Sequence, residues 1–144
     1  MIYDQADYFR IPLLDGSYGV GQVFEINAGG DNILFCGISI RKTDAVTQIE
    51  SFSPTDIIAV VRVTDDPLKT EQWPLGGFNQ IPRFRSFINY DRIAADGFPD
   101  HPVHDPAVIE AFVNALHGLY PWNAFGSLFD QIKRPDMDKP STAT

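Results

Sequence analysis

Cysteine is nearly absent from this sequence, which has a single one, Cys36, among 144 residues. One cysteine excludes a disulfide within the chain. Residues 1–5 lack the basic region and the apolar run that characterise an export signal. No stretch approaches the ~18 uninterrupted apolar residues that a membrane span requires. We therefore expect a cytoplasmic protein with no membrane-inserted segment.

Basic residues are also scarce, since 11 Lys and Arg stand against 19 Asp and Glu and the formal net charge is −8. A field of this sign repels phosphate backbones and anionic lipids and attracts a basic partner. We expect no nucleic-acid ligand and no membrane partner, whereas a basic protein such as a nuclease is favoured. Acidity also serves solubility alone, so the charge ranks partner classes without naming one.

The length and composition fit one domain with a real hydrophobic core. Apolar residues make up 44% of the chain and aromatic residues 12%, including 11 Phe, enough to offset chain entropy without disulfides or a structural metal. The last stretch, residues 133–144, is polar, contains proline and lacks periodicity, which is typical of a tail. We predict a single domain over residues 1–132 and a flexible C-terminal tail over residues 133–144.

The strongest local pattern is a β-hairpin. Two β-rich runs, residues 8–14 and 18–26, flank the sequence Asp-Gly-Ser at 15–17, and an Asp-Gly pair between such runs favours a tight turn. In the second run, Gly19 and Gly21 lie on the same face. This arrangement predicts strong bending or the close approach of another backbone.

Further patterns complete an α+β architecture. Apolar or β-branched runs predict strands at residues 33–40 and 57–64, and alternation suggests a fifth at 83–90. One helix is well marked after Asp105, and a shorter helix is expected within 122–132. The sequence therefore predicts a small, strongly bent antiparallel β-sheet, or a partly open barrel of about five strands, packed by one or two C-terminal helices.

The histidines do not form a metal-binding pattern. Two residues separate His101 from His104 along the chain, but zinc needs three or four ligands in tetrahedral reach. The remaining histidine, His117, lies about 3.5 helical turns beyond His104 and would point elsewhere. We predict no metal site, because Asp105 is better explained as a helix cap.

No other group forms a convincing catalytic set. Cys36 lies in the most apolar predicted strand, where a buried thiol is inert. The pair Asp65-Asp66 precedes a proline at a strand end, a position typical of turn residues. The predictions are accordingly no catalytic residue, no enzyme activity and no cofactor.

A loop at residues 68–80 is the best candidate for a binding surface. Trp73 and Phe78 lie there among glycine and proline, and the acids Asp65, Asp66 and Glu71 flank them. Aromatic anchors with an acidic rim are typical of interface hot spots. We predict partner contacts at these five residues. The alternative is that both aromatic side chains tuck under the loop as a satellite core.

The hairpin resembles the opening of the bacterial immunity protein 26 family. Nine residues of the hairpin match the family pattern: Ile11, Pro12, Leu13, Gly16, Tyr18, Gly19, Gly21, Gln22 and Val23. A weaker resemblance extends to about Thr64, or to Pro74, and so covers about half of the chain. The resemblance implies a small β-rich domain that binds a co-encoded toxin effector domain and blocks its active site. The long C-terminal half, rich in proline and aromatic residues, departs from the family pattern.

Two other functions remain open at this point. One is a small ligand-binding or enzymatic β-barrel with a pocket near the glycine-rich hairpin. The other is a self-associating subunit that uses a sheet edge near Pro12. The sequence leaves the oligomeric state and the toxin chemistry undetermined.

Overall fold

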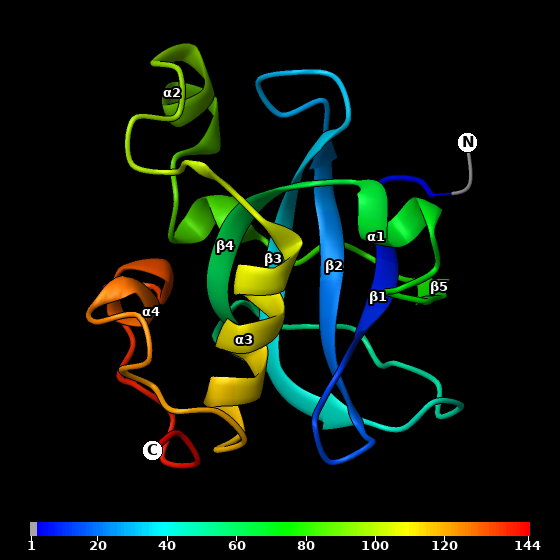
Figure 1. Cartoon of the computed structure of the whole chain (residues 1–144). Helices are drawn as coiled ribbons and strands as arrows, with labels where there is room; N and C mark the ends of the chain where they lie inside the picture. The colour runs from blue at the N-terminus through cyan, green and yellow to red at the C-terminus, as the bar shows by residue number, and fades with distance from the viewer. Residues whose placement is uncertain (1–2) are drawn as a thin grey trace.

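The computed structural model describes residues 3–144 and contains one mixed sheet in the order β5-β1-β2-β3-β4-β6 (Figure 1). Neighbouring strands pair antiparallel except β4 and β6, which are parallel. Within the described residues the sheet does not close, because β5 and β6 stay at opposite ends of the order. The strands are β1 (Asp7–Pro12), β2 (Tyr18–Ile26), β3 (Ile33–Thr43), β4 (Ile57–Thr64), β5 (Leu75–Phe78) and β6 (Val103–His104).

Short helices cover the sheet. The longest, α3, packs across the convex face as the capping pattern predicts: the Asp105 carboxylate accepts a 2.8 Å hydrogen bond from the Ala107 amide, and Pro106 opens the helix. Gly118, at φ 74°, follows its C-terminus. The helices are α1 (Asp66–Lys69), α2 (Tyr90–Ala95), α3 (Pro106–Leu116) and α4 (Leu128–Ile132), with 3-10 turns η1 (Pro54–Asp56) and η2 (Phe84–Ser86).

The predicted hairpin is present, and its glycines make room for side chains. A Cβ atom at Gly19 would overlap Val113 of α3, and one at Gly21 would overlap the Phe9 ring. The pairing of β2 with β3 shifts register twice, once between Gly19 and Gly21, and such bulges increase strand bending. Side chains make the closest approaches here, and the Gly37 main-chain oxygen would lie 3.1 Å from a Cβ atom at Gly21.

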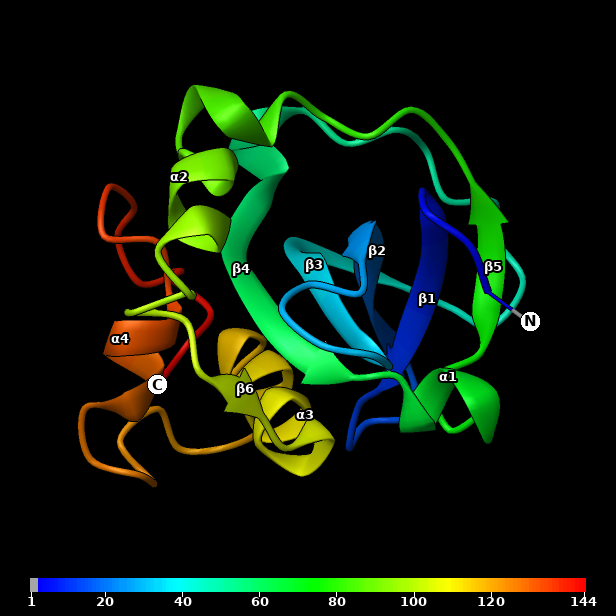
Figure 2. The ribbon, with the colours of Figure 1, turned by 90° about the horizontal axis from the view of Figure 1, so that it is seen from above.

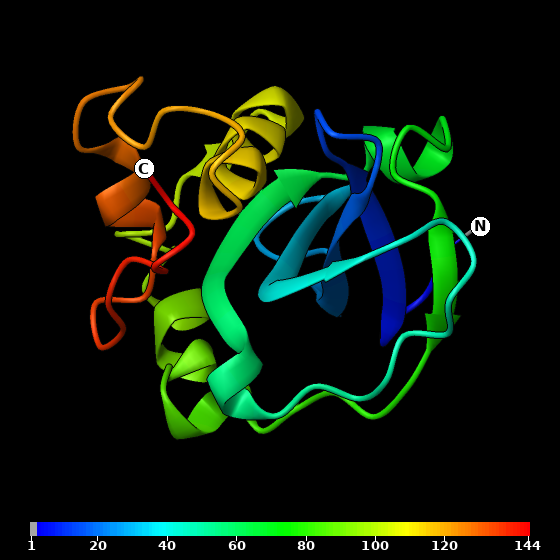
Figure 3. The ribbon, with the colours of Figure 1, turned by 90° about the horizontal axis from the view of Figure 1, so that it is seen from below.

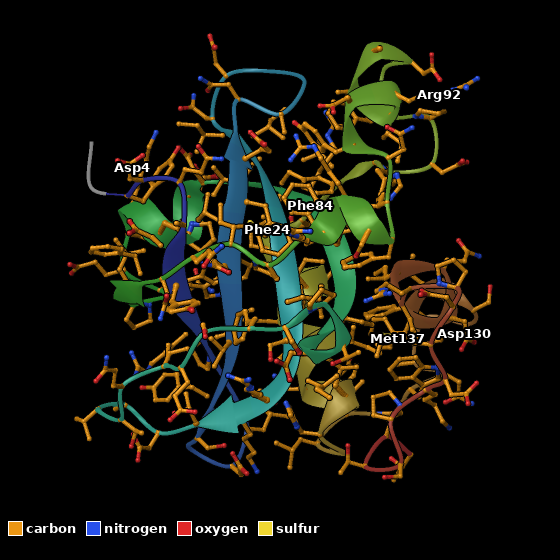
Figure 4. All side chains as sticks on the ribbon, turned by 180° about the vertical axis from the view of Figure 1, so that it is seen from behind. Asp4, Phe24, Phe84, Arg92, Asp130 and Met137 are labelled. Atoms are coloured by element: carbon orange, nitrogen blue, oxygen red, sulfur yellow. The ribbon has the colours of Figure 1, made fainter. Side chains whose placement is uncertain are left out.

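The bent sheet has a hydrophobic cluster on each face. On the convex face, α3 and α4 pack against alternate residues of the central strands, such as Phe9, Cys36 and Val61. On the concave face the cluster includes Phe24, Phe35 and Phe84 (Figure 4), with Phe24 and Phe84 stacked at 4.7 Å between ring centroids. Both faces are covered, so the central strands are apolar on both sides.

Two extended segments, residues 44–53 and 79–83, run along the open side of the sheet between β5 and β4 (Figures 2 and 3). Ile49, Phe52 and Ile81 from these segments join the concave cluster. Arg10 of β1 fixes the first segment, because its guanidinium donates to the main-chain oxygens of Asp44 (2.8 Å) and Thr47 (2.5 Å). The segments thus complete the core where strand pairing stops.

The prediction of a strand at residues 83–90 is wrong. The segment forms η2 and then enters α2, where the Asn89 side chain accepts from the Arg92 amide. Phe84 reaches the concave cluster from this turn, and β6 occupies the free edge of β4 that a fifth strand would need. The α+β class is confirmed, but the sheet has six strands and is mixed rather than antiparallel.

Residues 133–144, expected to form a flexible tail, make specific contacts with the rest of the chain. The Arg134 guanidinium donates to the main-chain oxygens of Pro54 (2.7 Å) and Ile57 (3.0 Å). The Thr142 hydroxyl donates to the Leu116 oxygen, and Ala143 is buried in the convex cluster. Polar composition hid these contacts, because the segment is held by hydrogen bonds to carbonyls that the helices and strands leave free.

Candidate interaction surface

Asp65, predicted as a partner contact, is a buried structural residue with 1% of its surface exposed. Its carboxylate accepts a 2.6 Å hydrogen bond from the Tyr3 hydroxyl and lies 3.2 Å from the Lys69 ammonium. Burial, followed by the bond to Asp65, raises the pKa of Tyr3 well above its usual value. Asp65 therefore lies beneath the turn into α1 rather than at the surface.

Trp73 is also buried, with 1% exposure. Its indole stacks on Phe9 at 5.4 Å between centroids, and its Nε1 donates to a carboxylate oxygen of Glu110 at 3.1 Å. Trp73 therefore packs under the loop, as the alternative prediction described. Trp73 joins the β5 side of the molecule to helix α3.

Three of the five predicted contacts remain at the surface. Asp66 begins α1, Glu71 follows α1 in a left-handed conformation (φ 63°), and both side chains are exposed. Phe78, the last residue of β5, is 77% exposed. A single exposed aromatic side chain is common on protein surfaces. The residues around Phe78 therefore determine whether it indicates a binding surface.

Those neighbours are acidic. Asp7 pairs with Phe78 across β1 and β5, and the Asp4 amide donates to the Asp7 carboxylate at 2.7 Å. Partial burial, with the Asp4 charge as a further cause, raises the pKa of Asp7. The Glu110 oxygen that accepts from Trp73 also accepts a 2.7 Å hydrogen bond from the side-chain amide of Gln72, the residue after Glu71.

We call this region the acidic edge and define it by Asp4, Asp7, Asp66, Glu71, Phe78 and Glu110. It lies where the N-terminal segment, α1 and β5 meet at one end of the sheet (Figures 1 and 2). Lys69 is nearby, but its ammonium is paired with Asp65. A surface hollow of about 440 Å³, lined by Leu68, Glu71, Pro74 and Leu75, connects α1 with β5.

Sequence reasoning missed Asp4, Asp7 and Glu110. Glu110 is 39 positions from Glu71, and Asp7 reaches Phe78 only through the pairing of β1 with β5. The sequence has no local pattern that announces this pairing, because β5 is four residues long and contains two glycines. The only signal was the acidic excess of the whole chain.

Cys36 and the metal-ligating side chains are the groups in the described residues 3–144 that bear on reactive chemistry. Cys36 is fully buried and burial raises the pKa of its thiol, so the reactive thiolate is disfavoured. No group of three or more metal-ligating side chains forms within the described part of the chain. His101 and His104 do lie close together, in a cavity at the other end of the sheet.

No protein-family model, curated protein or solved structure matches the chain. In the part of the chain that the structure describes, no helix has the length and apolar character needed to cross a bilayer.

Proposed function

We propose that this protein is a cytoplasmic immunity protein that binds a cognate bacterial toxin effector domain and blocks its active site. The observation that supports the proposal is Phe78, a large aromatic side chain that is 77% exposed within the acidic edge. Interface hot spots favour aromatic anchors enclosed by groups that exclude water, and acidic rims select basic partners.

The foundation of the acidic edge is rigid, which favours binding by a preformed surface. Trp73 is clamped between Phe9 and Glu110, and Asp65 anchors α1 from below. A surface held in this way loses little side-chain entropy on association, so more of the contact energy appears as affinity. An interface of about 800 Å² per partner fits within the 7295 Å² surface of this chain.

The electrostatics favour a basic toxin such as a nuclease. The acidic edge contributes five carboxylates, of which that of Asp7 lies opposite Phe78 in the sheet, and the chain carries a net charge of −8. Complementary fields of this kind raise association rates from about 10⁵–10⁶ to as much as about 10⁸–10⁹ M⁻¹s⁻¹ at low salt. The same field disfavours nucleic acid as a competing ligand.

The test is to search the neighbouring open reading frame for a large protein with a toxic C-terminal domain and to ask whether co-expression of this chain with that domain restores growth. The wild-type chain is expected to restore growth and to co-purify with that domain. The triple variant Asp66→Lys/Glu71→Lys/Phe78→Ala is expected to lose both properties while remaining folded. A matched control, Asp31→Lys/Asp138→Lys/Leu14→Ala, alters three exposed positions outside the acidic edge with the same change in charge.

Full rescue by the acidic-edge variant would reject this surface as the binding site. Failure of the wild-type chain to rescue growth or to bind the domain would reject the immunity function itself.

A further inference from the structure

A cavity of about 210 Å³ lies at the end of the sheet away from the acidic edge. Strand β4, the segment 100–104 and the C-terminal segment 131–136 enclose it, together with Phe87 and Ile88. At about 30 Å³ per water molecule, the volume corresponds to roughly seven waters or a small organic molecule. The cavity depends on the packed C-terminal segment, which is one of its walls.

The cationic side chains in the wall are held in place and keep their charge. Arg62 donates to the main-chain oxygens of Ala28 (3.0 Å) and His101 (2.8 Å), and its guanidinium lies 4.0 Å from the Phe98 ring centroid. Lys133 donates to the main-chain oxygens of Arg134 (3.1 Å) and Met137 (2.5 Å). Neutral carbonyls orient these cations without cancelling them.

Arg134 is the third cation and is neutralised in part. Its Nε and Nη2 atoms donate to the two Asp136 oxygens at 3.0 and 2.6 Å, and its guanidinium lies 3.5 Å from the Phe87 ring centroid. The cavity is thus lined by three cations and two carboxylates, those of Asp100 and Asp136. It is locally cationic in a chain whose net charge is −8.

Two imidazoles line the cavity, and one of them has a nitrogen that the described part of the fold leaves unpaired. His101 Nδ1 is buried and has no hydrogen-bond partner among the described residues. Buried polar nitrogens normally have partners. His104 lines the same cavity, near enough for its charge to be coupled to that of His101.

We propose that this cavity binds a small monocarboxylate. The carboxylate group lies between the imidazoles of His101 and His104, close to the Lys133 ammonium. The apolar part of the ligand contacts the hydrophobic portion of the wall, formed by Val60, Ile88, Pro102, Ile132 and Pro135. A dianion such as phosphate is disfavoured, because Asp100 and Asp136 would repel the second charge and the apolar wall would offer it no donors.

Binding of the carboxylate is expected to take up a proton. In the free protein, burial is the main cause that lowers the pKa of both His101 and His104, so the rings are neutral at pH 7. For His101, the charge of Asp100 opposes the lowering of the pKa and the charge of Arg62 adds to it. For His104, the charge of His101 lowers the pKa further. The other charges around the cavity are those of Lys133, Arg134 and Asp136.

A bound anion raises the imidazole pKa values, so affinity increases as the pH falls through the range in which histidine titrates. An increase of one pKa unit in the complex corresponds to about tenfold in the binding constant. Affinity levels off at a pH below the pKa values of the free protein, where the rings are already protonated.

The experiment is a titration of the full chain with benzoate, followed by the imidazole NMR signals and by calorimetry at about pH 5.5 and about pH 7.5. We expect saturable shifts of the His101 and His104 signals, and tighter binding at the lower pH by up to about tenfold. Benzamide, a neutral molecule of the same shape, and sulfate, which is a dianion at this pH, are expected to bind at least about tenfold more weakly than benzoate at pH 5.5.

The matched variants are His101→Asn/His104→Asn, which removes both imidazoles, and His117→Asn, which removes a half-buried histidine outside the cavity. Loss of benzoate binding in the first and retention in the second supports the proposal. Absence of saturable shifts in the wild-type chain, or equal binding of benzoate and benzamide, overturns it without need of a variant. None of these outcomes bears on toxin binding at the acidic edge.

Discussion

Replacement of Trp73 by alanine separates a supporting role under the acidic edge from a direct contact with a partner. The side chain is 1% exposed, stacks on Phe9 and donates to Glu110. Truncation of a buried tryptophan costs about 3–5 kcal/mol, a large part of the ~5–15 kcal/mol that stabilises a domain. For a chain of this length each kcal/mol lowers Tm by roughly 3 °C, so a decrease of about 9–15 °C is expected.

Urea denaturation measures this effect directly. Trp73→Ala is expected to lower the midpoint while the m-value stays constant, since the surface exposed on unfolding is nearly the same. Phe78→Ala is the matched control: its ring is 77% exposed, and the unfolding free energy should change by no more than about 0.5 kcal/mol. A loss below about 1 kcal/mol for Trp73→Ala would refute the conclusion that this side chain belongs to the core.

Three further changes test the fold. Gly37→Ala places a Cβ atom against the buried Phe24 ring and should cost about 1–3 kcal/mol by urea denaturation; an unchanged midpoint would contradict this packing. Arg134→Ala removes the donor to the main-chain oxygens of Pro54 and Ile57 and should cost about 2 kcal/mol in stability. Residues 135–144 should then be cleaved faster in limited proteolysis. Equal cleavage rates in the variant and the wild-type chain would show that these hydrogen bonds do not hold the C-terminal segment. Burial is the main cause that lowers the pKa of all three histidines below their usual value. Because the folded state disfavours their protonation, stability is complete above about pH 6.5 and falls as the pH is lowered towards 5, and His117→Asn should reduce this fall; a rise in stability over that interval would reverse the sign of the argument.

The sequence predicts the parts of the fold that local chemistry determines. Strand β4 runs from Ile57 to Thr64, within the predicted bounds, because a β-branched run favours a strand and the following Asp-Asp-Pro sequence ends it. Helix α3 begins after Asp105 for the same kind of reason, since its cap and first proline are adjacent in the chain.

The missed parts depend on partners far away in the sequence. Strands β5 and β6 are four and two residues long and exist because β1 and β4 offer them free edges. The predicted strand at 83–90 failed because Phe84 gains its contacts from a turn over the concave face. Alternation of apolar residues does not distinguish a strand from a turn that places one aromatic side chain in the core.

The candidate surface shows the same limit. Acidic and aromatic residues near α1 and β5 were identified from the sequence, but which of them are buried was not. Asp65 and Trp73 were expected at the surface and are buried in the structure. Asp7 of β1 and Glu110 of α3 belong to the acidic edge although they are distant from it in the sequence. Composition indicates the chemistry of a loop, whereas its exposed face follows from the elements that pack beneath it.

The central claim is that the acidic edge holds the toxin, and calorimetric titration with the neighbouring toxin domain tests it most directly. Phe78→Ala alone is expected to weaken binding by about 2 kcal/mol or more, as for a hot-spot aromatic. Asp66→Lys/Glu71→Lys is expected to weaken binding at low salt and to reduce the dependence of the affinity on salt. Affinities equal to that of the wild-type chain in both variants, with a folded protein in each, would contradict the account.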